Sequence, residues 1–212
     1  MSRCLVLDLD GTLVDSVPDL QGALNRLMAT RGLAPFTADA TQAMVGDGAR
    51  VLVERGFAAR NAMMADVDYD QFIADYTVNA AALSRPYPGV AATLQALADA
   101  GWTMAVCTNK PEIPARALLG TLELDHFFEA IGGGDSFPVR KPDPGHLLAT
   151  IAAAGCAPGD AIMVGDHHND IHAALGAGVR CVWAKWGYGM DVPGANAVAD
   201  RFADLPKVLQ AL

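Results

Sequence analysis

Short apolar runs that end in polar residues alternate with stretches of helical periodicity along most of this chain. The apolar runs, each the length of one buried strand, cover residues 4–7, 104–107, 161–164 and 179–183. The stretches with apolar residues at helical spacing cover residues 90–100, 113–119, 146–154 and 170–177. This alternation predicts an α/β fold with a doubly wound, Rossmann-like parallel sheet.

Residues 15–85 differ from the rest because they contain no convincing strand. Ser16, Pro18 and Asp19 are typical of a helix start, with Ser16 expected as the capping residue. Two apolar stripes at helical spacing follow, and we expect both to be packing surfaces: Leu20, Ala23, Leu24, Leu27, Met28, and Tyr69, Phe72, Ile73, Tyr76. The pattern predicts a core of residues 1–14 and 86–212 and a small helical domain, residues 15–85, inserted after the first strand.

Composition narrows the range of functions. The 212 residues carry a net charge of -9, which argues against a nucleic-acid surface, and 52% are hydrophobic, enough for a buried core. No stretch approaches the ~20 apolar residues of a membrane helix, and Asp8 interrupts the N-terminal apolar run too early for a signal peptide. The cysteines are scattered and form no CxxC pair, so we expect reduced thiols and a cytoplasmic protein.

Acidic residues follow the first and third of the predicted core strands. Asp8 and Asp10 lie just before Gly11, where the chain is expected to turn, and Asp166 precedes Asp170 by one helical turn. Carboxylates this close together repel unless a cation or a shared proton offsets them, and Mg²⁺ prefers such oxygen ligands. The alternative is that these acids are solvated or cap helices.

Two weaker polar clusters complete the pattern. Thr108, Asn109 and Lys110 follow the second strand, where they either cap a helix or bind phosphate oxygens at its N-terminus. Lys141 precedes a proline-stiffened turn, where it is either solvated or supplies one fixed positive charge.

His168 and His172 have the i, i+4 spacing of a zinc pair, but no third soft ligand accompanies them. Residues 132–134, Gly-Gly-Gly, are expected to form a loop.

In order and spacing, these four clusters resemble the motifs of the haloacid dehalogenase superfamily of phosphatases. The resemblance implies that Asp8 is the nucleophile and Asp10 the general acid/base, while Lys141 neutralises the phosphoryl group and orients Asp8. It further implies that Thr108, Asn109, Gly11 and Thr12 bind the substrate, and that Mg²⁺ is held by Asp8, Asp10, Asp166 and Asp170. An Asp at position 10 favours phosphatase or mutase chemistry, because dehalogenases lack that second Asp and the ATP-driven pumps carry Thr there.

Three segments further resemble the phosphoglycolate phosphatases: residues 45–50, 133–144 and 186–189. Gly46 and Gly48 would let the insert approach a small substrate, whose carboxylate either Arg50 or Lys110 would bind. The alternative for Arg50 is a solvated helix residue. His167 departs from the Ser that commonly follows the metal-binding Asp in this family.

The expected function is Mg²⁺-dependent hydrolysis of a small phosphomonoester, 2-phosphoglycolate, through an aspartyl-phosphate. The alternatives are a phosphatase for a sugar phosphate such as N-acetylmuramate 6-phosphate, a β-phosphoglucomutase-like mutase, and a non-catalytic phospho-receiver module. A receiver would not need a helical insert of about 70 residues. The expected partner is the small-molecule substrate, with no nucleic acid or membrane, and the chain would act as a monomer or homodimer.

Overall fold

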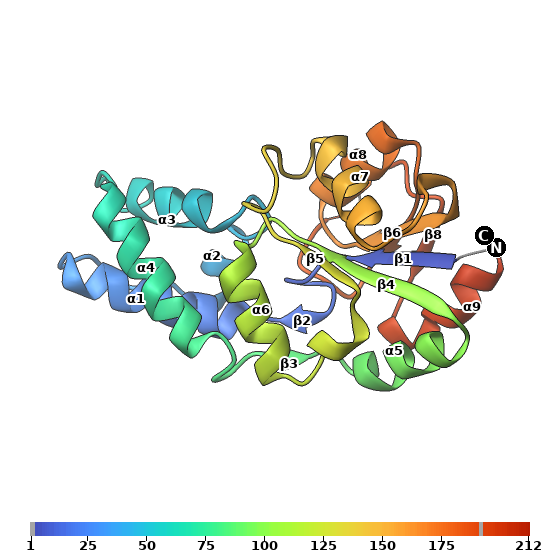
Figure 1. Cartoon of the computed structure of the whole chain (residues 1–212). Helices are drawn as coiled ribbons and strands as arrows, with labels where there is room; N and C mark the ends of the chain where they lie inside the picture. Colours follow the sequence, from blue (N-terminus) through green and yellow to red (C-terminus); the bar gives the residue numbers. More distant parts are fainter. Residues whose placement is uncertain (1–2, 191–192) are drawn as a thin grey trace.

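The computed structural model describes residues 3–190 and 193–212. Its centre is a six-stranded parallel sheet with the order β5-β4-β1-β6-β7-β8 (Figure 1). The strands span β1 Arg3–Leu7, β4 Trp102–Cys107, β5 Ala130–Gly132, β6 Ala161–Gly165, β7 Arg180–Ala184 and β8 Ala197–Ala199. The predicted α/β fold with a parallel sheet is therefore confirmed.

Strand order places the carboxyl ends of β1 and β6 side by side. From β1 the chain builds outward through β4 and β5, and then returns to add β6, β7 and β8 on the other side of β1. Leu7 of β1 pairs with Val106 of β4 and with Val164 of β6. Such a reversal of direction opens a crevice beyond the strand ends, which is where α/β sheets bind ligands.

Helices cover both faces of the sheet. Cys4 and Val6 pack into the cluster that includes Leu147 of α7, whereas Leu5 and Leu7 pack into the larger cluster on the opposite face. The helices of the core span α5 Val90–Asp99, α6 Glu112–Thr121, α7 Pro144–Ala153, α8 His168–Ala177 and α9 Leu205–Gln210. Short 3₁₀ turns lie at Asp125–Phe127, Pro158–Asp160 and Phe202–Asp204.

Four helices make up the insert that follows β1, on the left of Figure 1. They span α1 Val17–Thr30, α2 Ala38–Gln42, α3 Ala49–Ala58 and α4 Asp66–Asn79. Leu24, Phe57 and Phe72 are fully buried among them. At the base of the insert, β2 Val14–Asp15 pairs antiparallel with β3 Arg85–Pro86, so that the two connections to the core run side by side.

Ser16 does not cap α1 through its side chain, contrary to the prediction. Its hydroxyl donates a hydrogen bond to Oδ1 of Asp10 at 2.5 Å, so it is drawn toward the sheet edge rather than toward the helix N-terminus. Asp19 instead accepts hydrogen bonds from the backbone N–H groups of Leu83 and Ser84 and from the Ser84 hydroxyl. The start of α1 therefore fastens the insert to both of its connections.

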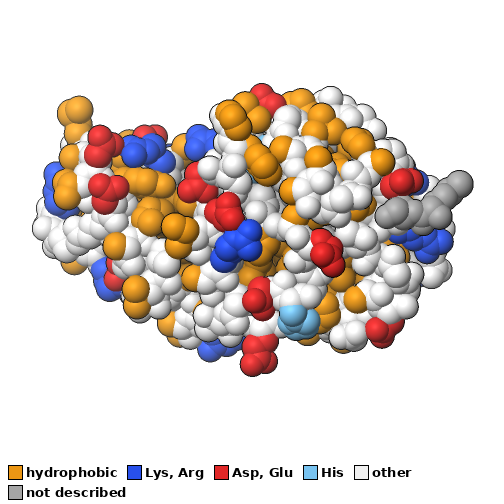
Figure 2. Space-filling model, in the orientation of Figure 1, with side chains coloured by type: hydrophobic (Ala, Val, Ile, Leu, Met, Phe, Trp, Pro, Cys, Tyr) orange, Lys and Arg blue, Asp and Glu red, His pale blue; other side chains and the backbone are white. Residues whose placement is uncertain are grey.

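The face of the molecule drawn in Figure 2 carries acidic and basic side chains interspersed, with hydrophobic side chains between them. Within residues 3–190 and 193–212, no helix has the length and hydropathy needed to cross a membrane.

Candidate active site

Three buried carboxylates meet at the crevice between β1 and β6. Asp8 follows β1, Asp166 follows β6, and Asp170 lies in the first turn of α8. Their ligand oxygens lie within 4.8 Å of one another. Burial, and then the charge of Asp170, raises the pKa of Asp8 to about 6, and burial with the charge of Asp8 raises the pKa of Asp166 to about 7. An all-oxygen, crowded and desolvated set of acids fits a hard divalent cation such as Mg²⁺.

Gly11 and Thr12 support this cluster. Gly11 has φ +88, and a Cβ there would lie 2.5 Å from Oδ2 of Asp166, so only glycine fits the turn. The Thr12 hydroxyl donates to Oδ1 of Asp166 at 2.7 Å, and the backbone N–H of Tyr188 donates to Oδ2 at 2.7 Å. The structure thus places Gly11 and Thr12, expected as substrate-binding residues, against Asp166 and outside the lining of the cavity described below.

Lys141 is the buried cation of the cluster. Its Nζ donates to Asp8 Oδ1 at 2.8 Å, to Asp170 Oδ1 at 2.5 Å and to the carbonyl oxygen of Cys107 at 2.5 Å. Burial alone would lower the pKa of Lys141, but the charges of Asp170 and Asp8 outweigh it and raise that pKa. Lys141 therefore stays charged and fixes the orientation of the Asp8 carboxylate.

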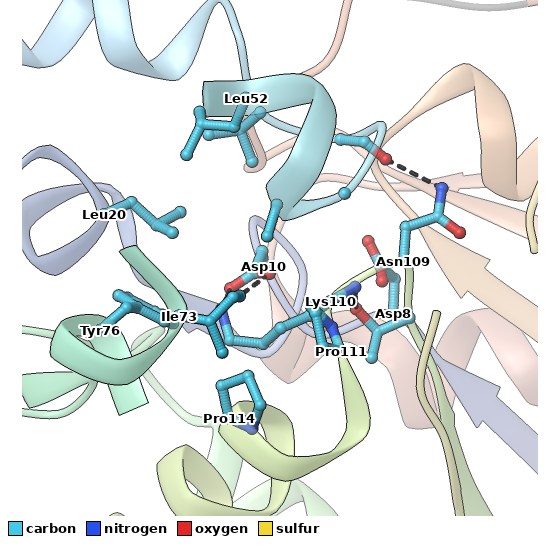
Figure 3. Close-up of a pocket in the computed structure, with 15 residues that line it drawn as sticks. Asp8, Asp10, Leu20, Leu52, Ile73, Tyr76, Asn109, Lys110, Pro111 and Pro114 are labelled. Carbon is cyan, nitrogen blue, oxygen red and sulfur yellow. Dashed lines mark hydrogen bonds and ion pairs between the residues drawn. The ribbon is translucent and has the colours of Figure 1, made fainter. Parts of the chain in front are cut away.

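Asp10 belongs to a second ion pair, with Lys110, at the same cavity (Figure 3). Its carboxylate accepts hydrogen bonds from Lys110 Nζ at 2.9 and 3.1 Å and from the Ser16 hydroxyl. Lys110 is 5% exposed, and its Nζ lies 4.4 Å from the ring centroid of Tyr76 on α4. Burial would lower the pKa of Lys110, but the charge of Asp10 raises it, so this lysine is also a cation.

Thr108 and Asn109, both buried, follow β4 beside these acids. Thr108 Oγ1 accepts a hydrogen bond from the backbone N–H of Lys110 at 3.1 Å. Asn109 Nδ2 donates to the carbonyl oxygens of Lys141 at 2.9 Å and of Gly46 at 3.0 Å. Asn109 Oδ1 has no hydrogen-bond partner within the described part of the chain. Asn109 therefore links the insert to the core at the edge of the site.

A small cavity of about 40 Å³ lies between the acids and the insert. Core and insert both contribute to its walls, as Figure 3 shows. The core side is polar, with Asp8, Asp10 and Lys110, while the insert side is apolar and includes Leu20 and Ile73. Periodicity had indicated that Leu20, Ile73 and Tyr76 serve only packing, but the structure places all three on the cavity wall.

Arg50 does not reach this cavity. It lies on α3 with 43% of its side chain exposed, donates to Asp66 Oδ1 at 2.9 Å, and stacks 4.3 Å from the ring centroid of Tyr69. Of the two cations expected to bind a substrate carboxylate, the structure brings only Lys110 to the site. Arg50 is drawn away because Asp66 and Tyr69 offer it partners on the outer surface of the insert.

The geometry combines the parts needed for nucleophilic attack at phosphorus. Asp8 is a buried carboxylate held in place by Lys141, Asp10 is a second carboxylate at the same cavity, and the neighbouring acids fit a divalent cation. The apolar residues that the insert adds to the cavity, such as Leu20 and Ile73, lower the polarity of the surroundings in which these carboxylates lie.

Comparisons with known proteins agree with this geometry. Residues 5–184 match the family model described as "Haloacid dehalogenase-like hydrolase". A phosphoglycolate phosphatase of Agrobacterium fabrum is 47% identical over 99% of this chain and 93% of its own length. One of Caulobacter vibrioides is 43% identical over 96% of this chain and 89% of its own length. The crystal structure of a predicted phosphoglycolate phosphatase from Haemophilus somnus 129pt superimposes with a TM-score of 0.89 at 32% identity, covering 97% of each chain.

Proposed function

Because this chain belongs to the haloacid dehalogenase-like hydrolase family, we propose that it hydrolyses 2-phosphoglycolate to glycolate and phosphate through an aspartyl-phosphate on Asp8. The observation that carries the proposal is the buried Asp8–Lys141 pair, in which Asp8 lies on the wall of a small cavity that Lys110 also lines. Relatives that are 40–47% identical over most of their length bear the name phosphoglycolate phosphatase.

The proposed reaction has two steps. First, the Asp8 carboxylate attacks phosphorus, the ester P–O bond breaks, and Asp10 gives its proton to the departing glycolate oxygen. Then Asp10 takes a proton from water, the water oxygen attacks the phosphorus of the aspartyl-phosphate, and Asp8 is released with inorganic phosphate. Lys141 holds Asp8 in line throughout and offsets the negative charge of the transferred group, with Thr108 and the backbone of Asn109 as donors to its oxygens.

The donor set fits Mg²⁺, which Asp8, the backbone carbonyl of Asp10, Asp166 and Asp170 would hold. When bound, Mg²⁺ offsets the repulsion between the Asp8 carboxylate and the dianionic substrate. The ammonium group of Lys141, which is paired with Asp8 and Asp170, adds a second positive charge beside the metal site.

Lys110 is the proposed ligand of the substrate carboxylate. It is buried, charged and on the cavity wall, where its present partner is Asp10. A substrate carboxylate that draws Lys110 away from Asp10 leaves Asp10 free to carry the proton that the leaving oxygen needs. The apolar insert wall offers few partners for sugar hydroxyls, which favours this small acid over N-acetylmuramate 6-phosphate or a phosphosugar mutase substrate.

We further propose that residues 15–85 act as a cap domain that opens and closes over a core of residues 1–14 and 86–212. The paired β2 and β3 are the two connections about which it would move.

The free thiols support a reducing, cytoplasmic setting for the protein. They are Cys4, Cys107, Cys156 and Cys181.

The test compares 2-phosphoglycolate with ethyl phosphate, in which a methyl group replaces the carboxylate. With Mg²⁺ present, we expect kcat/KM to favour 2-phosphoglycolate by about 100-fold, since a charge-assisted hydrogen bond contributes about 1.5–3 kcal/mol. Equal values for the two esters would contradict the proposed substrate. Net isomerisation of a sugar phosphate without phosphate release would favour the mutase instead.

A further inference from the structure

A second group of metal-ligating side chains lies where the insert meets the core. It consists of Asp47 from the loop between α2 and α3, His167 at the N-cap of α8, and His168 at the first position of that helix. One ligand atom from each lies within 4.8 Å of the other two. None of the three has a part in the reaction proposed above.

Hydrogen bonds hold two of these side chains in place. Nδ1 of His167 accepts from the backbone N–H of Asn169 at 3.4 Å, which leaves Nε2 as its free ligand atom. Asp47 Oδ1 accepts from Asn169 Nδ2 at 2.7 Å, and Asp47 Oδ2 accepts from Arg55 at 2.5 Å. Outer contacts of this kind orient metal ligands before the ion arrives.

The cluster is also accessible. Asp47 and His167 are half-buried and His168 is exposed. His167 and His168 line an open hollow of about 470 Å³, on which Val45 of the insert and Tyr188 of the core also lie. An ion can therefore enter from solvent without passing through the catalytic cavity.

The ligand types separate this cluster from the acids around Asp8. Two imidazoles and one carboxylate suit Zn²⁺ and its late transition-metal neighbours, whereas Mg²⁺ prefers oxygen alone. Three protein ligands with one position left to water make a common zinc coordination set. We propose that Asp47, His167 and His168 form a second metal site, selective for a divalent transition ion such as Zn²⁺.

Occupation of this site would fasten the insert to the core. Asp47 belongs to the insert and both histidines to the core, so all three ligands meet only when the two parts are together. The adjacent Gly46 lies so close to His167 that a Cβ on it would be 2.5 Å from Nε2. An ion that binds only this closed arrangement stabilises it and slows product release, which requires opening.

His172 provides a matched control. It lies one turn further along α8, and its ring meets the His168 ring edge-on with the centroids 5.8 Å apart. The proposed ligand set therefore differs from the i, i+4 histidine pair noted in the sequence. It combines His168 with Asp47 and His167, and it does not include His172.

The test is isothermal titration of Zn²⁺ into the full-length protein at saturating Mg²⁺. We expect one Zn²⁺ per chain for the wild type and for His172→Gln. We expect His168→Gln and Asp47→Asn to weaken binding by about 100-fold or more, since the loss of outer-sphere partners alone costs 10–100-fold. The absence of zinc binding, or equal binding by His168→Gln, would overturn the proposal.

Asp166→Asn distinguishes this site from the catalytic acids. It should keep the zinc site, whereas loss of zinc binding in Asp166→Asn with retention in His168→Gln would place the ion at Asp8 and refute the proposal. Zn²⁺ should also lower kcat of the wild type, because product release requires the insert to open. His168→Gln should lose this inhibition, and equal inhibition of both would argue against a closing role.

Discussion

At the level of single residues, two buried lysines pair with different carboxylates of the site. Lys141 holds Asp8 and Asp170 together, and Lys110 holds Asp10, so each carboxylate of the motif has a different partner. Like charges this close would otherwise force one acid to stay protonated. Separate partners for Asp8 and Asp10 suit the proposed reaction, in which Asp8 attacks phosphorus and Asp10 transfers a proton.

Lys110 and Arg50 make the clearest comparison for substrate choice. Replacing Lys110 by Met should narrow the preference for 2-phosphoglycolate over ethyl phosphate by about 100-fold, because the carboxylate loses its charged donor. Replacing Arg50 by Met should change that preference by less than about twofold, since exposed ion pairs contribute little. Steady-state kinetics on both esters measures the ratio. If only the Arg50 variant lost the preference for 2-phosphoglycolate, Arg50 and not Lys110 would be the ligand of the substrate carboxylate.

His146 makes stability depend on pH. Burial, and then the charge of Lys141, lowers the pKa of His146 to about 4, although the backbone of Gly133 and Gly132 and then the charge of Asp143 act in the opposite direction. The folded state therefore binds this proton less readily than the unfolded state, whose histidine titrates near 6.5. The stabilisation is complete above about pH 6.5 and is lost as pH falls toward 4.

His146→Gln should remove that dependence. Between pH 7 and pH 4, the difference in unfolding free energy between wild type and variant should shrink by about 3 kcal/mol, measured by urea denaturation. The comparison with wild type is needed because the raised pKa values of Asp8 and Asp166 act in the opposite sense. A difference that does not vary with pH would show that His146 does not titrate as described.

At the level of elements, Asp19 ties α1 to the end of the insert. Its carboxylate accepts hydrogen bonds from three donors, the backbone N–H groups of Leu83 and Ser84 and the Ser84 hydroxyl, and Asp19 is 4% exposed. Asp19→Ala leaves these donors without a partner, so it should lower the unfolding free energy by about 3 kcal/mol. Asp70→Ala, at an exposed position of α4, is the matched control and should stay near wild type. Equal melting curves for the two variants would refute this role.

The sequence predicted the long, buried elements and missed the short ones. β1, β4, β6 and β7 are apolar runs of five or six residues, so their pattern stands out. β5 and β8 have three residues each, and β5 runs into the Gly132–Gly134 tract that was expected to be a loop. Such strands depend on a neighbour's hydrogen bonds more than on their own composition.

Some residues of the site were predictable from the sequence and others were not. Residues at strand ends, such as Asp8, Thr108 and Asp166, were predictable because parallel strands bring their carboxyl ends together. Leu20 and Ile73 were not, since helical periodicity identifies a buried face without saying whether it faces other helices or a cavity. The position of Arg50 depends on Asp66 and Tyr69, which only the packing of α3 against α4 brings near.

At the level of the whole molecule, the cavity exists only because insert and core meet. Asn109 and Asn169 both donate to the carbonyl oxygen of Gly46, so two core segments hold the same loop of the insert. The carboxylate cluster below is the part of the core that a cation would stabilise.

Mg²⁺ should therefore raise the melting temperature. At about 100 times its dissociation constant, a ligand of the native state adds about 2.7 kcal/mol, or roughly 5–10 °C for a chain of this size. Asp166→Asn should lose most of this increase in a thermal melt. An undiminished increase in that variant would place the cation elsewhere.

The claim on which the account depends is that the phosphoryl group passes through Asp8. Mass spectrometry of enzyme quenched during turnover of 2-phosphoglycolate tests it most directly. We predict one added phosphoryl group on the peptide that contains Asp8, and none in Asp8→Asn, which should also lack turnover. Turnover by Asp8→Asn at the wild-type rate, or a phosphoryl group on a different residue, would contradict the account.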